Sequence, residues 1–224
     1  MFSEMFYKLW DNGLIQMGVV ETIYMTLIAT LFSYLLGLPL GVLLCVTDTN
    51  GIRPTPWLNR SLGFIVNFFR SIPFIILMVA MLPVAKFILG TSLGNGAVIV
   101  MLIIGASPYV ARMVESSVKE VSSGVIEAAQ SMGCTNMQII AKVLLPEAKP
   151  SLINGAVISM VTILGSAMAA TIGGTGLGQI AIIYGHQRSN SDITWVCVLM
   201  TVIIVQLIQI IGTRIAHKTD KRIK

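Results

Sequence analysis

The longest polar interval of the sequence, residues 112–149, lies between very apolar segments and contains the most regularly spaced candidate functional residues. Its centre carries Glu-Ala-Ala at 127–129, with Gly133 six residues after the glutamate, and Leu-Pro at 145–146 closes the stretch. Nowhere in the sequence do histidines or carboxylates form a constellation for metal or acid–base chemistry. The chemistry expected of this interval is therefore recognition of another molecule.

Two short amphipathic helices are expected to carry these residues, one on each side of Gly133. The serines and glycine at 122–124 favour a helix start, and the apolar residues that follow recur at the spacing of one helical face. Gly133 suits the left-handed position that ends a helix. The predicted face of the first helix consists of Val125, Ala128, Ala129 and Met132.

The second helix is predicted to start from a capping box, Thr-x-x-Gln, formed by Thr135 and Gln138. Pro146 either ends this helix or opens the next one at its first position. The two helices would form a rigid corner that docks into a groove on another protein, or a surface loop on the lipid headgroups. The predicted apolar face of the second helix consists of Met137, Ile140, Ala141 and Leu144.

The spacing of Glu-Ala-Ala, glycine and Leu-Pro resembles the EAA loop of ABC importer permeases, with Val143 where isoleucine is usual. The resemblance implies that the loop couples this chain to a separate cytoplasmic ATPase. The residues that it assigns to coupling and ATPase docking are Glu127, Ala128, Ala129, Gly133, Asn136, Met137, Ile140, Ala141, Leu144, Leu145 and Pro146.

Three further stretches, at 67–79, 105–115 and 177–185, are similar to the permease subunit of methionine ABC importers. This resemblance covers most of the chain, but Gly165 stands where those permeases often have an aromatic residue. It implies a type I ABC importer transmembrane domain that moves methionine, in the L and also the D form, into the cytoplasm. Two alternatives stay open: an ABC importer for another small amino acid or peptide, and an ATPase-independent carrier.

The partners that the resemblance implies are a second copy of this chain, two copies of a cytoplasmic ABC ATPase, an extracytoplasmic methionine-binding protein and membrane lipid. ATP and Mg²⁺ would bind to the ATPase. This chain has no Gly-Lys dipeptide, which a Walker A loop requires. It would therefore be a transport subunit without a cofactor or enzymatic activity of its own. No nucleic-acid partner is expected, because the net charge of +5 is small and comes largely from the C-terminal tail.

Composition indicates an all-α, multi-pass membrane protein, and the resemblance implies that it lies in the inner (cytoplasmic) membrane. The chain has 224 residues, of which 55% are hydrophobic and 11% are charged, whereas soluble domains have about 25% charged residues. Residues 1–224 are expected to form a single domain without a signal peptide.

A glycine-rich run at 173–178 should separate the fourth span from an exposed segment. The five predicted transmembrane helices cover about residues 22–46, 62–85, 95–111, 151–172 and 193–212.

The distribution of lysine and arginine predicts the orientation. With five spans, the tail and the loops at 53–60 and 112–149 lie on one side, and they hold eleven of the fifteen basic residues. The positive-inside rule therefore places the C-terminus and the coupling loop, residues 112–149, in the cytoplasm and the N-terminus outside.

Three residues within predicted spans are candidates for the transport pathway. Arg70 is costly inside a membrane, so it either reaches the headgroups or contacts the substrate. Ser166 and Met168 lie near the outer end of the fourth span, where they either line a pathway or pack between helices. No metal site is expected, since His186 and His217 are placed on opposite sides of the membrane.

Overall fold

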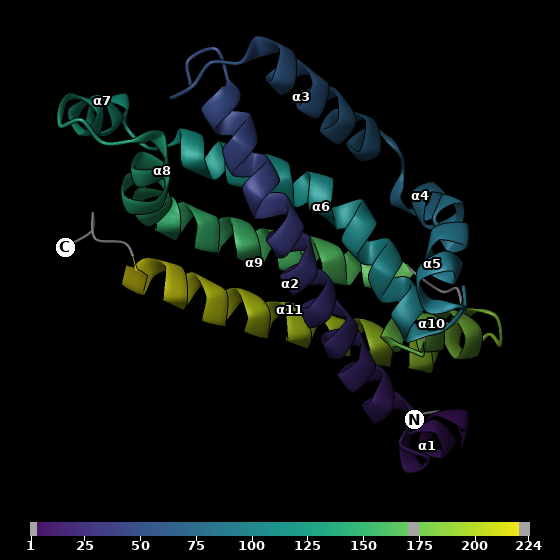
Figure 1. The fold of residues 1–224 in the computed structure, drawn as a ribbon. Coiled ribbons are helices and arrows are strands. Elements are labelled where there is room, and N and C mark those ends of the chain that lie inside the picture. The colour runs from purple at the N-terminus through teal and green to yellow at the C-terminus, as the bar shows by residue number, and fades with distance from the viewer. Residues whose placement is uncertain (1–3, 170–174, 220–224) are drawn as a thin grey trace. The chain divides into compact units, whose positions relative to one another are not determined.

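The computed structural model describes residues 4–169 and 175–219, which are helical throughout apart from turns and connecting segments (Figure 1). This confirms the predicted all-α fold. In chain order the elements are α1 (Glu4–Asp11), α2 (Leu14–Thr47), α3 (Pro56–Ser71), α4 (Phe74–Ala80), α5 (Leu82–Leu89), α6 (Asn95–Lys119), α7 (Ser123–Ser131), α8 (Asn136–Ile139), the π-helix η1 (Ile140–Leu144), α9 (Leu145–Ala169), α10 (Leu177–Ile180), the π-helix η2 (Ala181–His186) and α11 (Ser191–Thr219).

Within the described ranges, four helical stretches are long and apolar enough to cross a membrane. They are α2, α6, the continuous run Asn136–Ala169 and α11. The helices α3 and α4 form a bent pair that would count as one further span. The predicted number of five spans therefore requires that this bent pair be one of them.

The predicted second span, residues 62–85, is wrong as a continuous helix. The helix α3 ends at Ser71, α4 begins at Phe74, and α5 follows after Met81. Pro73 lies at the first break in an extended conformation, with φ −54° and ψ 133°. Proline lacks an N–H donor and disfavours a helical conformation in the residue before it, so the helix stops there instead of kinking.

Other predicted span boundaries also change. The helix α2 begins at Leu14 rather than near residue 22, and α11 extends to Thr219 rather than ending near residue 212. The helix α6 begins at Asn95, as predicted, but continues eight residues beyond 111 to Lys119. The fourth span begins at Leu145 instead of residue 151, and its predicted end at 170–172 lies outside the described residues.

The segment after the fourth span was predicted to be exposed, and from Leu177 onwards this prediction is wrong. Residues 177–186 form α10 and η2, and Leu177 and Ile180 are buried. A side chain at Gly178 would clash with the carbonyl oxygen of Met168, so this short helix packs directly on the α9 backbone. The glycines at 173 and 174 lie outside the described residues.

The chain forms two compact units, and α2, α6, α9 and α11 each contribute to both. Unit 1 comprises Met1–Leu31, Ile72–Ala106 and Met160–Gln209. One of its apolar clusters joins α2, α4, α5, α6 and α9 around Met78 and Met101. A second joins α1, α2, α9, α10 and α11 around Leu164 and Ile193.

Unit 2 comprises Phe32–Ser71, Ser107–Ser159 and Ile210–Lys224, and it contains the whole predicted coupling loop. Its main apolar cluster joins α2, α6, α7, α8, η1 and the start of α9. Two glycines let α2 approach α6 closely: a Cβ atom at Gly37 would lie 2.7 Å from Val110 Cγ1, and one at Gly41 would clash with the carbonyl oxygen of Ala111. This close approach fixes α6 as the support of the coupling loop.

Candidate coupling surface and its polar network

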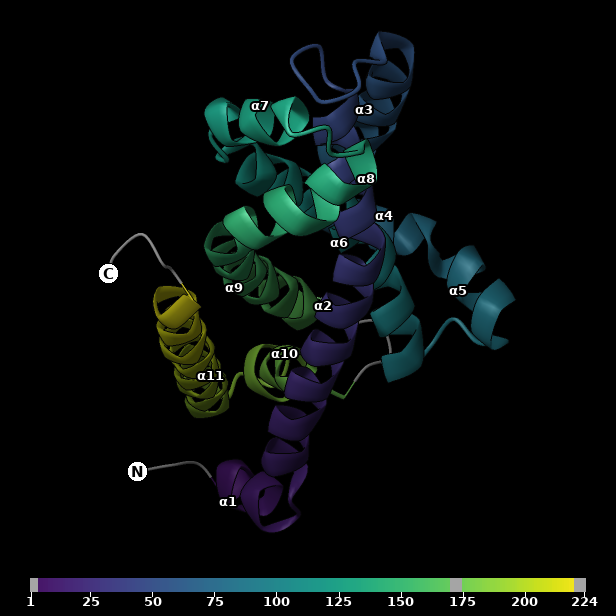
Figure 2. The same cartoon turned by 60° about the vertical axis from the view of Figure 1, so that its left-hand side comes forward.

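The predicted corner at Gly133 is present and has a defined hydrogen-bond geometry. Gly133 has φ +76°, in the left-handed region, and directly follows Met132, the C-cap residue of α7. The amide of Gly133 donates to the Gln130 carbonyl (2.9 Å), and the amide of Cys134 donates to the Ala129 carbonyl (3.2 Å). These two bonds form the Schellman motif that glycine favours at a helix C-terminus. The helices α7 and α8 lie side by side as a result (Figure 2).

The predicted capping box of the second helix is also present. The Gln138 amide donates to Thr135 Oγ1 (3.4 Å), and the Thr135 amide donates to Gln138 Oε1 (2.8 Å). Two otherwise unpaired amides at the start of α8 are thereby satisfied. Because Gly133 and Thr135 are only two residues apart, the chain has little freedom between one helix end and the next helix start.

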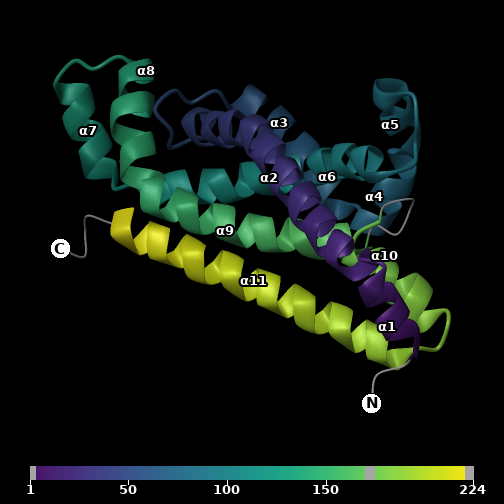
Figure 3. The ribbon, with the colours of Figure 1, turned by 90° about the horizontal axis from the view of Figure 1, so that it is seen from below.

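Pro146 neither ends the second helix nor stands at the first position of a separate one, so the structure differs from both predicted alternatives. The helix α8 passes through η1 into α9, and Pro146 is the second residue of α9. A proline at this position removes one backbone donor, and the wider π-helical turn directly before it accommodates that loss. At this turn the helix changes direction, so α8 runs across the line of α9 (Figure 3).

The residues predicted to dock divide into a buried and an exposed group. Ala129 and Leu144 are buried in the main apolar cluster of unit 2, and Ile140 and Leu145 are half-buried against it. The prediction that Leu144 belongs to an exposed docking face is therefore wrong, because this side chain holds η1 to its own unit. The exposed members are Glu127, Ala128, Gly133, Asn136, Met137, Ala141 and Pro146.

Two methionines give the exposed group its apolar character. The side chains of Met132 and Met137 are 76% and 74% exposed, and they flank Gly133 in sequence. Methionine is flexible and polarisable, so it adapts to the shape of a partner surface. An exposed apolar pair on a rigid corner is typical of a docking element. Met132 was assigned to a helical face but not to the docking residues, and its exposure is the signal that adds it.

Glu127 is turned towards its own unit. It lines a cavity of about 440 Å³ together with Gln130 from α7, Lys119 at the end of α6, and Asp48 and Asn50 from the segment after α2. The carboxylate therefore shares this space with a cation and a second carboxylate. An arrangement of this kind can keep α7 in place relative to the ends of α2 and α6.

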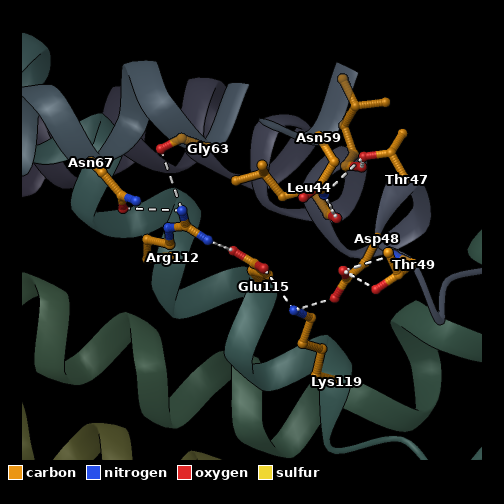
Figure 4. A network of polar contacts seen from close by, with 11 residues as sticks. Leu44, Thr47, Asp48, Thr49, Asn59, Gly63, Asn67, Arg112, Glu115 and Lys119 are labelled. Atoms are coloured by element: carbon orange, nitrogen blue, oxygen red, sulfur yellow. Dashed lines mark hydrogen bonds and ion pairs between the residues drawn. The ribbon is translucent and has the colours of Figure 1, made fainter. Parts of the chain in front are cut away.

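A chain of charged groups supports the end of α6, and sequence reasoning missed it (Figure 4). Glu115 accepts hydrogen bonds from Arg112 Nη1 (2.6 Å) and Lys119 Nζ (2.8 Å) on the same helix. Lys119 Nζ also donates to Asp48 Oδ2 (2.7 Å), directly after α2. Arg112 Nη2 donates to Asn67 Oδ1 (3.0 Å) on α3.

The network joins α2, α3 and α6 at the base of the coupling loop. The Glu115 side chain is only 8% exposed, so its two cations are needed to offset the cost of burying a charge. The hydrogen bond from Lys119 lowers the pKa of the Asp48 carboxyl below its usual range. The spacing of Arg112, Glu115 and Lys119 at i, i+3 and i+7 is the sequence signal that could have predicted the part within α6.

The three candidate pathway residues lie in different units. Ser166 and Met168 belong to unit 1, and Arg70 belongs to unit 2. Ser166 is half-buried and donates to the Thr162 carbonyl of its own helix (3.1 Å), and Met168 Sδ accepts a weak hydrogen bond from Thr201 (3.8 Å). These contacts are those of helix packing, and a pathway role for either residue stays a prediction.

Arg70 lies in the last turn of α3, and its side chain is exposed. The predicted span around it is not one continuous helix, because α3 ends one residue later, at Ser71. A cation at a helix C-terminus interacts favourably with the helix dipole. This position favours the first of the two predicted alternatives, in which the guanidinium reaches polar surroundings.

Arg70→Lys should therefore leave transport almost unchanged, because lysine keeps a cation at the helix end. Uptake of labelled substrate by proteoliposomes should give a KM within about twofold of the unmodified protein. Arg70→Leu, which removes the cation, should reduce the stability by less than about 1 kcal/mol. A large rise in KM for Arg70→Lys at unchanged expression would instead assign Arg70 to substrate contact.

Comparison with known proteins places these features in a wider context. The family model described as "Binding-protein-dependent transport system inner membrane component" matches residues 37–224. The chain is 48% identical over 213 residues to the "Probable D-methionine transport system permease protein MetI" of Vibrio cholerae, with 95% of each chain covered. It is 45% identical over 216 residues to the "Methionine import system permease protein MetP" of Bacillus subtilis, covering 96% of this chain and 95% of that protein.

Solved structures extend the likeness to three dimensions. A chain from "Inward facing conformations of the MetNI methionine ABC transporter" matches with a TM-score of 0.93 and 44% identity, covering 98% of this chain and all of that one. A chain from an "amino acid ABC transporter with histidines" matches with a TM-score of 0.75 over 97% of this chain. Its identity is only 18%, so this second match concerns the fold alone.

Proposed function

Because the chain belongs to the family of binding-protein-dependent transport system inner membrane components, we propose that it is the permease subunit of an ATP-driven importer of methionine, in both enantiomers. The observation that carries this proposal is the match along 98% of the chain, at 44% identity, to a chain of a methionine ABC transporter. The relatives named for methionine or D-methionine transport support the same substrate. In this proposal residues 1–224 act as one transmembrane domain.

The proposed assembly contains two copies of this chain, two copies of a cytoplasmic ATPase and an extracytoplasmic methionine-binding protein, within membrane lipid. The ATPase binds ATP and Mg²⁺ and hydrolyses the nucleotide, and this chain provides the pathway. A pair of chains is physically sensible, because the five spans of one copy hardly enclose a gated path. The ATPase grips the exposed corner that Met132, Gly133 and Met137 form.

Force passes from the ATPase to the spans through this corner. ATP binding closes the ATPase pair and moves the corner as a rigid body, because the capping box and the Schellman motif fix α7 and α8 to each other. The helix α8 continues through η1 into α9, so a displacement of the corner tilts α9 directly. The charged network transmits the same displacement through α6 to α2 and α3. The pathway then opens alternately to each side.

The proposed orientation has the C-terminus and the coupling loop in the cytoplasm and the N-terminus outside. The excess of lysine and arginine on the side of the tail supports this orientation. It also places the exposed corner where a cytoplasmic ATPase can reach it.

Labelling of single cysteines tests the orientation. In a version whose three natural cysteines are replaced, Gln187→Cys should react with a membrane-impermeant maleimide added to intact cells, since Gln187 is exposed at the end of η2. Asn136→Cys should react only after the membrane is opened. The reverse labelling pattern would contradict both the orientation and the coupling assignment.

Reconstitution tests the function itself. The chain, its ATPase and its binding protein are placed in liposomes, and ATP hydrolysis and uptake are measured with one candidate amino acid at a time. L- and D-methionine should stimulate hydrolysis and accumulate inside the liposomes, and histidine at the same concentration should do neither. Stimulation by another amino acid alone would replace methionine as the substrate, and uptake without ATP would exclude an ABC importer.

A further inference from the structure

The helix α11 exposes two glutamines near the middle of its length. Gln206 and Gln209 lie close to the midpoint of this 29-residue helix, one of the four long apolar spans. Both side chains are exposed, and neither forms a hydrogen bond with any other residue that the structure describes. An unpaired amide is costly at this depth of a bilayer, because no water is present to pair with it. The two amides therefore require a partner from outside the chain.

The exposed side chains around these glutamines recur at the spacing of a heptad repeat. From residue 195 to residue 209 the steps alternate between four and three residues along one unbroken helix (Figure 3). This spacing is typical of helices that pack side by side in left-handed pairs, in water and in membranes. All five side chains lie in unit 1 and are exposed. This α11 seam consists of Trp195, Leu199, Val202, Gln206 and Gln209.

The neighbouring exposed face of α11 carries no polar group over the same turns. Ile203 and Leu207, both 54% exposed, each follow a seam residue directly and are therefore turned away from the seam by about 100°. Apolar side chains of this kind suit lipid tails, whereas amides at the same depth suit a protein surface. The exposed side of α11 thus divides into a lipid face and a seam that faces protein.

We propose that the α11 seam packs against the same seam of a second copy of this chain. The proposal rests on the proposed function, which requires two copies in one membrane. Copies inserted in the same orientation are related by a two-fold axis along the membrane normal, so their α11 helices run parallel and each seam residue meets its counterpart. An extensive uncovered surface is available, since only 17% of the most apolar part of α11 is buried, the lowest share among the four long spans within the described ranges.

Glutamine suits a contact between identical residues. Its amide contains both donors and an acceptor, so Gln206 can exchange hydrogen bonds with Gln206 of the partner subunit. A polar residue in an otherwise apolar seam also fixes the register of a helix pair, because any shift along the helix leaves the amide facing an apolar side chain. Leu199 and Val202, which are 60% and 50% exposed, supply the apolar contacts on the same seam.

Disulfide formation between single cysteines tests the pairing in the assembled transporter. The three natural cysteines are replaced, and each variant is placed with its ATPase in membrane vesicles without nucleotide and oxidised with copper phenanthroline. A disulfide requires Cα atoms within about 7 Å, which counterpart residues of a packed seam reach and residues on a lipid face do not. Leu199→Cys and Gln206→Cys should give at least about fivefold more cross-linked dimer than Ile203→Cys and Leu207→Cys.

The controls are matched in exposure, because Leu199 is 60% exposed and Leu207 is 54% exposed. Leu199→Cys leaves both glutamines in place, so the test does not depend on a variant that removes an amide. Equal yields at all four positions, or higher yields at Ile203 and Leu207, would overturn the pairing. Protection of Gln206→Cys from a maleimide by methionine, without cross-linking, would assign the glutamines to the transport path and would overturn it as well.

The outcome is separable from the proposed function, because cross-linking requires neither substrate nor transport. Strong cross-linking along the seam together with absence of methionine uptake would keep the pairing of α11 and reject the methionine importer. Methionine uptake by a transporter that cross-links only through Ile203→Cys or Leu207→Cys would keep the importer and reject the seam.

Discussion

Glu115→Ala is expected to cause the largest loss of stability of any single change in the polar network. The Glu115 carboxylate is buried and accepts short hydrogen bonds from both Arg112 and Lys119. Its removal leaves two cations close together without the charge between them, and breaking a buried ion pair in this way costs about 3 kcal/mol. Thermal unfolding of the purified chain in detergent, followed by circular dichroism at neutral pH, should show a clearly lower midpoint.

Asp48→Asn is the matched control at the exposed end of the same network. Its ion pair with Lys119 is open to solvent, so its loss should cost less than about 1 kcal/mol. Because the pKa of Asp48 is lowered in the folded protein, its contribution is present above the ordinary carboxyl pKa and disappears as the pH falls through the lowered value. Equal midpoints for Glu115→Ala and Asp48→Asn at neutral pH would contradict the central role of Glu115.

The sequence predicted those features of the coupling surface that depend on neighbouring residues. Glycine is the residue that tolerates the left-handed conformation, so Gly133 indicated the end of α7, and Thr135 with Gln138 indicated the start of α8. Both signals act over three or four residues and need no knowledge of the remaining fold. The all-α fold followed from composition for a similar reason, since a lipid bilayer admits few kinds of backbone.

Features that depend on distant residues could not be predicted in the same way. The pairing of Lys119 with Asp48, and of Arg112 with Asn67, requires that the ends of α2 and α3 lie against α6. Leu144 is likewise buried by residues of α2 and α6 in the same cluster. The apolar face of the second helix was visible in the sequence, but the sequence did not show which of its side chains pack within the unit and which are open to a partner. The glycine-rich run at 173–178 predicts an exposed segment after it, yet Gly178 allows close packing on the α9 backbone.

Gly133→Val is expected to leave the chain folded and inserted but to uncouple it from its ATPase. A Cβ atom at this position meets no other atom within 4 Å, so the cost is backbone strain alone, about 1–2 kcal/mol. The chain can relieve that strain by opening the Schellman motif and turning α8 relative to α7. Because Met132 and Met137 lie on either side of Gly133, this rotation changes the surface that the ATPase would grip.

The measurement is a side-by-side comparison of Gly133→Val and Gly133→Asn at matched expression. Asparagine adopts the left-handed conformation more readily than a β-branched residue, so it should keep the corner, ATPase binding and most uptake. Valine should still insert and dimerise, because Gly133 is exposed and is not a member of the apolar clusters of either unit. It should bind the ATPase weakly or leave hydrolysis independent of uptake. Full and equal activity of both variants would mean that the left-handed turn at Gly133 does not set the geometry of docking.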